Sequence, residues 1–178
     1  MKNILLFLLI IISGSTFSQG KFITKKGVIN FEASVPSFEE VKATNSTVTA
    51  ILNTDNGEIA ALALIKGFRF KNALMEEHFN ENYIESDDYP KATFKGKLVD
   101  FDKNNIQKEY IIKGTLSLHG KSKEIETKGT LTKNDNNISI SSTFITQPED
   151  FNIKIPSIVS KKIADDISVS LNFNLIKK

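Results

Sequence analysis

The sequence predicts an all-β fold of eight antiparallel strands, closed as a barrel or stacked as a sandwich, with one short α-helix inserted. Three observations support this prediction: apolar and polar side chains alternate along most of the chain, turn residues separate many of the alternating segments, and one segment alone changes to helical spacing. An eight-stranded barrel is either just filled by side chains or wide enough for one small ligand. The pattern of residues leaves both interiors open.

Alternation with period two predicts the strands, because successive side chains of a strand point to opposite faces. The expected strands are 27–35, 45–53, 58–70, 92–102, 109–118, 124–132, 138–146 and 166–176. The last of them alternates most regularly, so Leu171 is expected to point inward and Asn172 outward. Asp55-Asn56-Gly57 predicts a hairpin turn, because these residues tolerate positive φ. The stretch 148–165 has no regular pattern and is expected to be irregular.

Residues 67–98 contain the one change from strand spacing to helical spacing and back. Before the change, even spacing predicts one buried strand face, formed by Leu62, Leu64, Phe68 and Phe70. Asn72 fits a helix N-cap, because its side-chain oxygen can accept a free N–H of the first turn. Met75, Phe79 and Tyr83 then form a narrow apolar stripe. Pro90 returns the chain to an extended conformation, and the helix is expected to cover a barrel mouth or a sheet face.

The first residues have the order of a secretory signal peptide. A short basic start, Met1-Lys2-Asn3, precedes an unbroken apolar run over 4–12, and Thr16-Phe17-Ser18 offers a cleavage site. This run is too short to span a bilayer, which needs about 20 residues. We therefore expect a signal peptide over 1–18, a single domain over 19–178, and a periplasmic or secreted location. The alternative is a buried N-terminal strand.

Composition excludes several classes of protein. The formal net charge is +2, from 23 basic and 21 acidic residues, which argues against a nucleic-acid-binding protein with its basic stripe. The sequence has no cysteine, so neither a disulfide nor a lipid anchor on an N-terminal cysteine is possible. No later segment is apolar enough to cross a membrane.

The sequence offers few residues for catalysis or metal binding. Its 2 histidines are His78, interpreted as a helix-edge residue, and His119, interpreted as a hairpin-turn residue that bonds the backbone. A metal centre needs three or four suitably spaced ligands. The acidic side chains of 76–88 lack the glycine and the spacing of a calcium loop, so a solvated helix face is expected. Without a nucleophile turn or a phosphate-binding glycine motif, we expect no catalytic residue, no metal and no cofactor.

Apolar residues remain the main signal. The chain has 13 phenylalanines and no tryptophan, and several phenylalanines fall on predicted inward faces. One interpretation is an ordinary packed core. The other is a cavity for a long apolar ligand, whose affinity would grow with the apolar area that it buries.

Three stretches, in this order, carry a resemblance to a known family. They are His78-Phe79 through Tyr89-Pro90 to Phe94, Gly114-Thr115-Leu116 through His119-Gly120 to Ile125, and Asp150-Phe151-Asn152-Ile153. Together they make the chain resemble the YceI-like family of exported polyisoprenoid-binding proteins over nearly all of 19–178. The chain departs from the family pattern at Lys71-Asn72, at Gln147-Pro148 and at Asn152.

The resemblance implies a closed, lipocalin-like β-barrel that holds an isoprenoid chain, such as a quinone or polyprenyl lipid, in an apolar tunnel, and no enzyme activity. We therefore expect an exported carrier that binds an isoprenoid or another long-chain apolar lipid, with Tyr83, Tyr89 or His78 near its head group. The candidate ligand-binding residues are Phe31, Leu62, Leu64, Phe68, Phe70, Met75, Phe79, Tyr83, Phe94, Leu116, Phe144, Val169, Leu171 and Phe173. The alternatives are a filled barrel that acts through a protein partner and an enzyme that modifies a bound isoprenoid.

Overall fold

The computed structural model describes residues 20–36 and 38–178, so the predicted signal peptide lies outside the described residues. The long strands are β1 (Lys21–Ser34), β2 (Lys42–Asn53), β3 (Glu58–Leu64), β5 (Lys91–Leu98), β6 (Glu109–Leu118), β7 (Lys121–Asn134), β8 (Asn137–Thr146) and β9 (Ile163–Lys177). A ninth strand, β4 (Arg69–Phe70), has two residues. The helical segments are a 3-10 turn over Ile65–Gly67, α1 (Ala73–His78) with a π-helical turn over Phe79–Tyr83, a 3-10 turn over Pro148–Phe151, and α2 (Ser157–Ser160).

The eight long strands form a closed antiparallel barrel. Each pairs with its neighbours in the order β1-β9-β8-β7-β6-β5-β3-β2, and pairing between β1 and β2 closes the circle. The extra strand β4 pairs only with β2. Closure satisfies the backbone groups that an open sheet edge would leave unpaired. This confirms the predicted eight-stranded barrel with one short inserted helix, and it excludes the sandwich.

The final strand alternates as predicted. Leu171 lies opposite Ile29 of β1 and faces the interior, while Asn172 is exposed. Val169 and Phe173 share the inward face, which continues to Leu175. The strand begins at Ile163, earlier than expected, because residues 163–170 pair with β1 and β8 through backbone hydrogen bonds that need no alternation of side chains.

The third predicted strand is wrong in two respects. It ends at Leu64, where the 3-10 turn Ile65–Gly67 interrupts it before β4. The inward residues of β3 are Ile59, Ala61 and Ala63, so Leu62 and Leu64 lie on the opposite face, and Leu64 is 50% exposed. The sequence Ala60-Ala61-Leu62-Ala63-Leu64 is apolar at every position, so its alternation does not identify the buried face.

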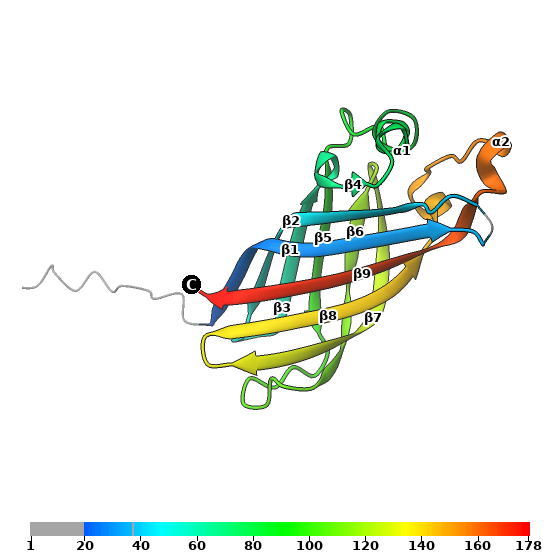
Figure 1. Ribbon diagram of the computed structural model, residues 1–178. Helices are drawn as coiled ribbons and strands as arrows, with labels where there is room; N and C mark the ends of the chain where they lie inside the picture. Colours follow the sequence, from blue (N-terminus) through cyan, green and yellow to red (C-terminus); the bar gives the residue numbers. More distant parts are fainter. Residues whose placement is uncertain (1–19, 37) are drawn as a thin grey trace, which may run out of the picture.

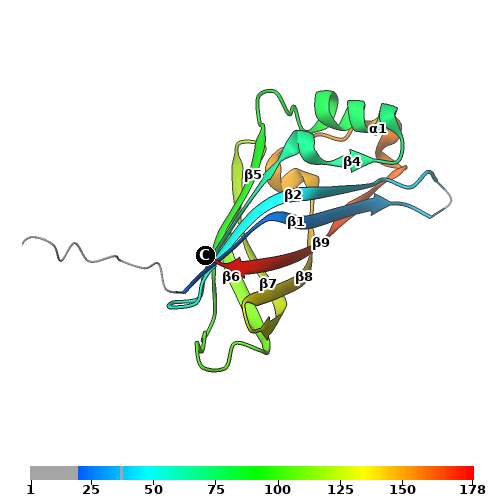
Figure 2. The ribbon, with the colours of Figure 1, turned by 60° about the vertical axis from the view of Figure 1, so that its left-hand side comes forward.

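The two ends of the barrel differ. Helices α1 and α2 and the connection between β1 and β2 gather at one end, and the C-terminus lies at the other (Figures 1 and 2). The second end is packed with fully buried side chains, including Val48, Leu52, Ile138, Ile140 and Leu175. Within residues 20–36 and 38–178, no helix is long and apolar enough to cross a membrane.

Candidate functional site

A cavity of about 430 Å³ occupies the half of the barrel next to α1 and α2. Its wall consists mainly of aliphatic and aromatic side chains from strands β1, β3, β5, β6, β8 and β9. Residues of both helices border it, including Met75 of α1 and Val159 of α2. The barrel is therefore hollow at one end and filled at the other, so the cavity interpretation and the packed-core interpretation each describe one half.

Four phenylalanines form an aromatic cluster on the cavity wall below α1: Phe31, Phe68, Phe70 and Phe79. Their ring centroids lie 5.1 Å apart for Phe70 and Phe79 and 5.4 Å apart for Phe31 and Phe68. The rings are tilted or meet edge to face, the arrangements that aromatic quadrupoles favour. Phe31 belongs to β1, Phe68 directly precedes β4, Phe70 ends β4, and Phe79 begins the π-helical turn after α1. The cluster therefore connects this helical lid to the barrel.

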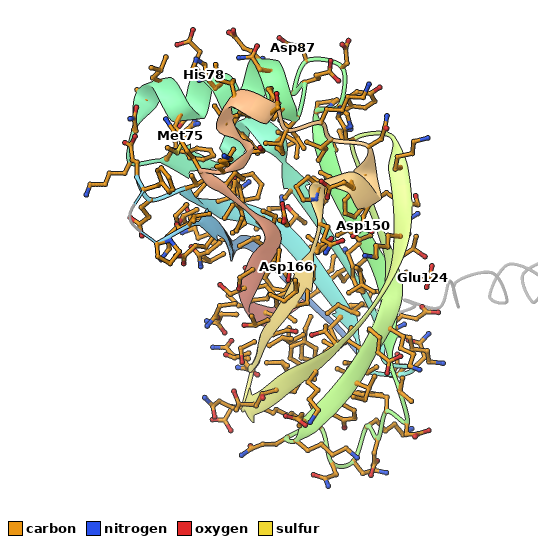
Figure 3. The ribbon with its side chains drawn as sticks, turned by 90° about the vertical axis from the view of Figure 1, so that its right-hand side faces the viewer. Met75, His78, Asp87, Glu124, Asp150 and Asp166 are labelled. Atoms are coloured by element: carbon orange, nitrogen blue, oxygen red, sulfur yellow. The ribbon has the colours of Figure 1, made fainter. Side chains whose placement is uncertain are left out.

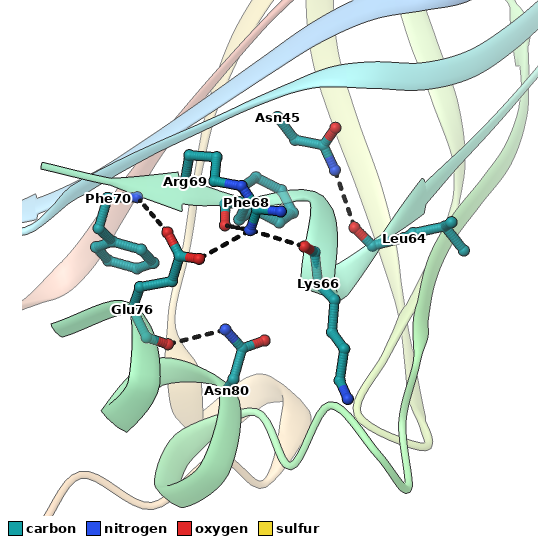
Figure 4. Close-up of polar contacts among 8 residues, drawn as sticks. All are labelled: Asn45, Leu64, Lys66, Phe68, Arg69, Phe70, Glu76 and Asn80. Atoms are coloured by element: carbon teal, nitrogen blue, oxygen red, sulfur yellow. Dashed lines mark hydrogen bonds and ion pairs between the residues drawn. The ribbon is translucent and has the colours of Figure 1, made fainter. Parts of the chain in front are cut away.

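Local hydrogen bonds place α1 over the cavity. The side-chain oxygen of Asn72 accepts the backbone N–H groups of Leu74 and Met75, which confirms the predicted N-cap. Glu76 then accepts a hydrogen bond from the Phe70 backbone N–H at 3.0 Å and pairs with Arg69 at 2.8 Å (Figure 4). These contacts fix the helix against β4, and Met75 lies on the barrel side of α1 (Figure 3).

The turn after α1 is π-helical. The backbone N–H of Ile84 donates to the carbonyl of Phe79, five residues earlier, at 3.0 Å. The Asn80 side-chain amide donates to the carbonyl of Glu76 at 2.8 Å (Figure 4), competing with the regular helical ladder. Met75, Phe79 and Tyr83 all line the cavity, so the predicted apolar stripe faces the barrel.

The cavity has few polar groups in its deeper part. Thr127 and Ser142 lie side by side on β7 and β8, with their hydroxyl oxygens 3.1 Å apart. Ser142 donates to the carbonyl of Lys128 at 2.7 Å, and Thr127 donates to the carbonyl of Thr143 at 3.0 Å. Both hydroxyl protons are therefore used by the backbone, and the oxygens keep lone pairs that a ligand hydroxyl can reach.

All but two of the predicted ligand-binding residues lie on this cavity wall. They are Phe31, Phe68, Phe70, Met75, Phe79, Tyr83, Phe94, Leu116, Phe144, Val169, Leu171 and Phe173. The exceptions, Leu62 and Leu64, follow from the wrong facing of β3 described above. Contact of these residues with a ligand stays a prediction.

The predicted head-group residues divide into two groups. Tyr83 and His78 border the cavity at the helical end. Tyr89 instead packs on His119, with ring centroids 4.3 Å apart, and is not part of the wall. His119 is buried in the β6–β7 turn and contacts the Phe151 carbonyl oxygen at 3.0 Å, as expected of a turn residue that bonds the backbone.

Asp150 links the turn after β8 to β7. Its carboxylate accepts a hydrogen bond from Lys123 and another from the backbone N–H of Gln147 at 3.1 Å. The hydrogen bond from Lys123, followed by that from Gln147, holds the pKa of Asp150 below its usual value of 3.8. Phe151, the next residue, is fully buried and borders the cavity, so this link positions part of the mouth.

Sequence reasoning missed one part of the wall. Ile153, Ile155, Val159 and Ile163 border the mouth, although they belong to the stretch that was expected to be irregular or to its continuation into β9. The signal was present as apolar residues at alternate positions 153 and 155. It was too short to separate a lining segment from a loop.

The described part of the chain contains no group of three or more histidine, aspartate and glutamate side chains arranged to hold a metal ion. The polar side chains that border the cavity are mostly hydroxyls, amides and a few charged groups at the mouth, such as Glu39 and Lys162. Glu39 is held by a 2.8 Å hydrogen bond from the Asn72 side chain. This arrangement suits burial of an apolar molecule better than proton transfer.

Fold and site together define a closed antiparallel β-barrel with one hollow, apolar half under a helical lid. The chain belongs to the YceI-like family: the sequence model of the YceI-like domain matches residues 18–175. No curated protein sequence gave a significant match.

Solved structures of similar fold include proteins from Saccharophagus degradans, Burkholderia cenocepacia and Campylobacter jejuni. A polyisoprenoid binding domain from Saccharophagus degradans, implicated in plant cell wall breakdown, aligns with a TM-score of 0.75 and 13% identity over 89% of this chain and 99% of its own. BcnA from Burkholderia cenocepacia aligns with a TM-score of 0.72 and 12% identity, over 85% and 97%. The Campylobacter jejuni YceI protein aligns with a TM-score of 0.66 and 18% identity, over 81% and 89%. At these identities the likeness shows a shared fold.

Proposed function

We propose that this protein binds one long apolar lipid, an isoprenoid chain of the polyprenyl or quinone kind, inside the barrel cavity. The observation that carries the proposal is the cavity itself, about 430 Å³ in volume and walled mainly by hydrocarbon side chains. Cavities of this size are typical of small-molecule sites. Each CH₂ group of a ligand that leaves water for such a wall contributes about 0.8 kcal/mol. The polyisoprenoid binding domain with the same fold supports the choice of lipid.

The same proposal makes the protein a carrier in the periplasm or outside the cell, without catalysis and without a cofactor. Burial of hydrocarbon is sufficient for affinity, so neither a metal ion nor a reactive side chain is needed. Export rests on the order of basic, apolar and small residues in 1–18. N-terminal sequencing of the exported protein should find Gln19 first, and a retained Met1 would contradict the proposed location.

The test of binding is mass spectrometry of a solvent extract of the purified protein. We expect about one isoprenoid molecule per chain from protein that was purified without detergent. Protein stripped of lipid should also take up an added isoprenol. An empty extract combined with no uptake of any added isoprenol would rule out the proposed function.

A further inference from the structure

The cavity ends at one level on the strands that line it. Along β9, Phe173 borders the cavity, whereas Leu175 is fully buried and does not. Along β6, Ile112 borders it and Tyr110 does not, and along β8 the same change occurs between Ser142 and Ile140. Below this level the interior is packed, so these strands define a floor across the barrel.

Phe173 and Ile112 form the main part of this floor, and two glycines make room for them. A Cβ atom on Gly27 of β1 would come within 2.7 Å of the Phe173 ring, and a Cβ on Gly129 of β7 would collide with the Ile112 side chain. Each large side chain thus packs directly against the backbone of a glycine. Both side chains are almost fully buried, with exposed fractions of 2% and 3%.

The volume above the floor limits the length of a bound chain. An apolar cavity of about 150 Å³ accepts one benzene molecule, which corresponds to about 25 Å³ per carbon. On that scale a cavity of about 430 Å³ holds about 17 carbons. An isoprene unit contributes five carbons, so about three units fit above the floor. A polyprenyl chain of eight or nine units would leave most of its length outside.

We propose that Phe173 and Ile112 set the length of isoprenoid chain that this protein buries, about three units, whatever the full length of the ligand. This inference rests on the proposed function, because it assumes that an isoprenoid occupies the cavity. The floor fixes the number of isoprene units that the cavity can bury. Every further unit stays in the mouth between α1 and α2 and gains less free energy from burial.

The experiment is a competition among isoprenols of different length. Protein stripped of lipid is mixed with geraniol, farnesol, geranylgeraniol and solanesol in equal amounts, recovered on a column, and extracted for mass spectrometry. On the unaltered protein we expect occupancy to rise at least about tenfold from geraniol to farnesol, since the five further carbons are buried in the cavity, and to change little from geranylgeraniol to solanesol, whose further units stay outside it. A further tenfold rise from geranylgeraniol to solanesol would overturn the length limit. Occupancy by no isoprenol at all would instead rule out the proposed function.

Two variants change the volume of the cavity in opposite directions. Phe173→Ala removes one aromatic ring, a volume of about 150 Å³ that corresponds to about one isoprene unit. The ratio of geranylgeraniol to farnesol should then rise about tenfold over that of the unaltered protein. Ala61→Phe adds one ring to the wall of β3 inside the cavity, and it should raise the ratio of geraniol to farnesol. Each ratio is compared with the unaltered protein, so differences in water solubility among the isoprenols cancel.

Phe22→Ala is the matched control. Phe22 is 5% exposed and packs in the filled end without bordering the cavity. It should lower the melting temperature and leave the length preference unchanged. A folded Phe173→Ala protein with the same ratio of geranylgeraniol to farnesol as the unaltered protein would contradict the inference. A shift of this ratio in Phe22→Ala as large as in Phe173→Ala would contradict it as well. If Phe173→Ala does not fold, Ala61→Phe and the competition on the unaltered protein still decide.

Discussion

At the scale of single residues, His119 joins three segments through its imidazole ring. Its Nε2 lies 2.8 Å from a carboxylate oxygen of Glu85, in the loop after the helical lid, and its Nδ1 contacts the Phe151 carbonyl. The two partners are a side-chain carboxylate and a backbone carbonyl from different segments of the chain. Glu85 has a φ of 48° and His119 a φ of 49°, so the junction also fixes two left-handed residues.

We expect His119→Ala to lower the free energy of unfolding by about 1–3 kcal/mol, because the buried Phe151 carbonyl loses its partner. Urea unfolding measures this change. His78→Ala, at an exposed position at the end of α1, should change stability by no more than about 0.5 kcal/mol. Equal effects of the two substitutions would show that His119 carries no special contacts.

Asp150 predicts a pH dependence of stability. The hydrogen bond from Lys123 lowers the pKa of this carboxyl below 3.8 in the folded protein. Its contribution is therefore present above its usual pKa and is lost as the pH falls through the lowered value. Asp150→Asn should be less stable than the unaltered protein at pH 7, and the difference in urea midpoint should shrink below about pH 3.8. Asp165→Asn, at an exposed position, is the control. A stability difference between Asp150→Asn and the unaltered protein that stays constant down to about pH 2 would refute the lowered pKa of Asp150.

At the scale of elements, one carboxylate makes the polar connection between the helical lid and β4. Glu76 binds both Arg69 and the Phe70 backbone N–H, which connects α1 to β4. Glu76→Ala should accelerate hydrogen exchange of the Phe70 amide by about tenfold, equivalent to about 1.4 kcal/mol for a charge-assisted hydrogen bond. Glu77→Ala, one residue further and exposed, should leave that amide unchanged. Acceleration by both variants alike would mean that general helix stability, and not docking, is measured.

Regular alternation made most elements predictable. In the final strand, Val169, Leu171 and Phe173 alternate with polar residues, so one face alone could be buried. In β3 the residues of both faces are apolar, so local alternation cannot show which face points inward; its pairing with β2 and β5 places Ile59, Ala61 and Ala63 there. The mouth residues between β8 and β9 show alternation only at 153 and 155, which is too short a pattern to separate a lining segment from a loop.

At the scale of the whole molecule, the barrel is divided into a hollow half and a filled half. Both halves use the same strands and similar apolar residues, so the sequence could not tell where packing stops. The division depends on which large side chains meet across the barrel. Phe94 illustrates the effect on the wall of the hollow half: its ring lies over Gly96 and Gly114, where a Cβ atom would come within 2.6 Å and 2.8 Å of the ring.

The division predicts that one substitution has different effects at two inward positions of the same strand. Leu171→Lys places an ammonium group in a cavity that is connected to the mouth, so the protein should fold and lose its lipid. Leu175→Lys places the same group in the packed half, at a position with 0% exposure, where an unpaired charge costs several kcal/mol. That cost is comparable to a typical total stability of about 5–15 kcal/mol, so Leu175→Lys should not fold.

Thermal melting and the lipid content after purification distinguish these outcomes. Asn172→Lys, which points outward from the same strand, should stay within about 0.5 kcal/mol of the unaltered protein and keep its lipid. Equal melting temperatures for Leu171→Lys and Leu175→Lys would show that the barrel is not divided. If Leu171→Lys stays folded and keeps a full complement of lipid, the ligand lies elsewhere, because a chain that fills the cavity must contact the inward face of β9.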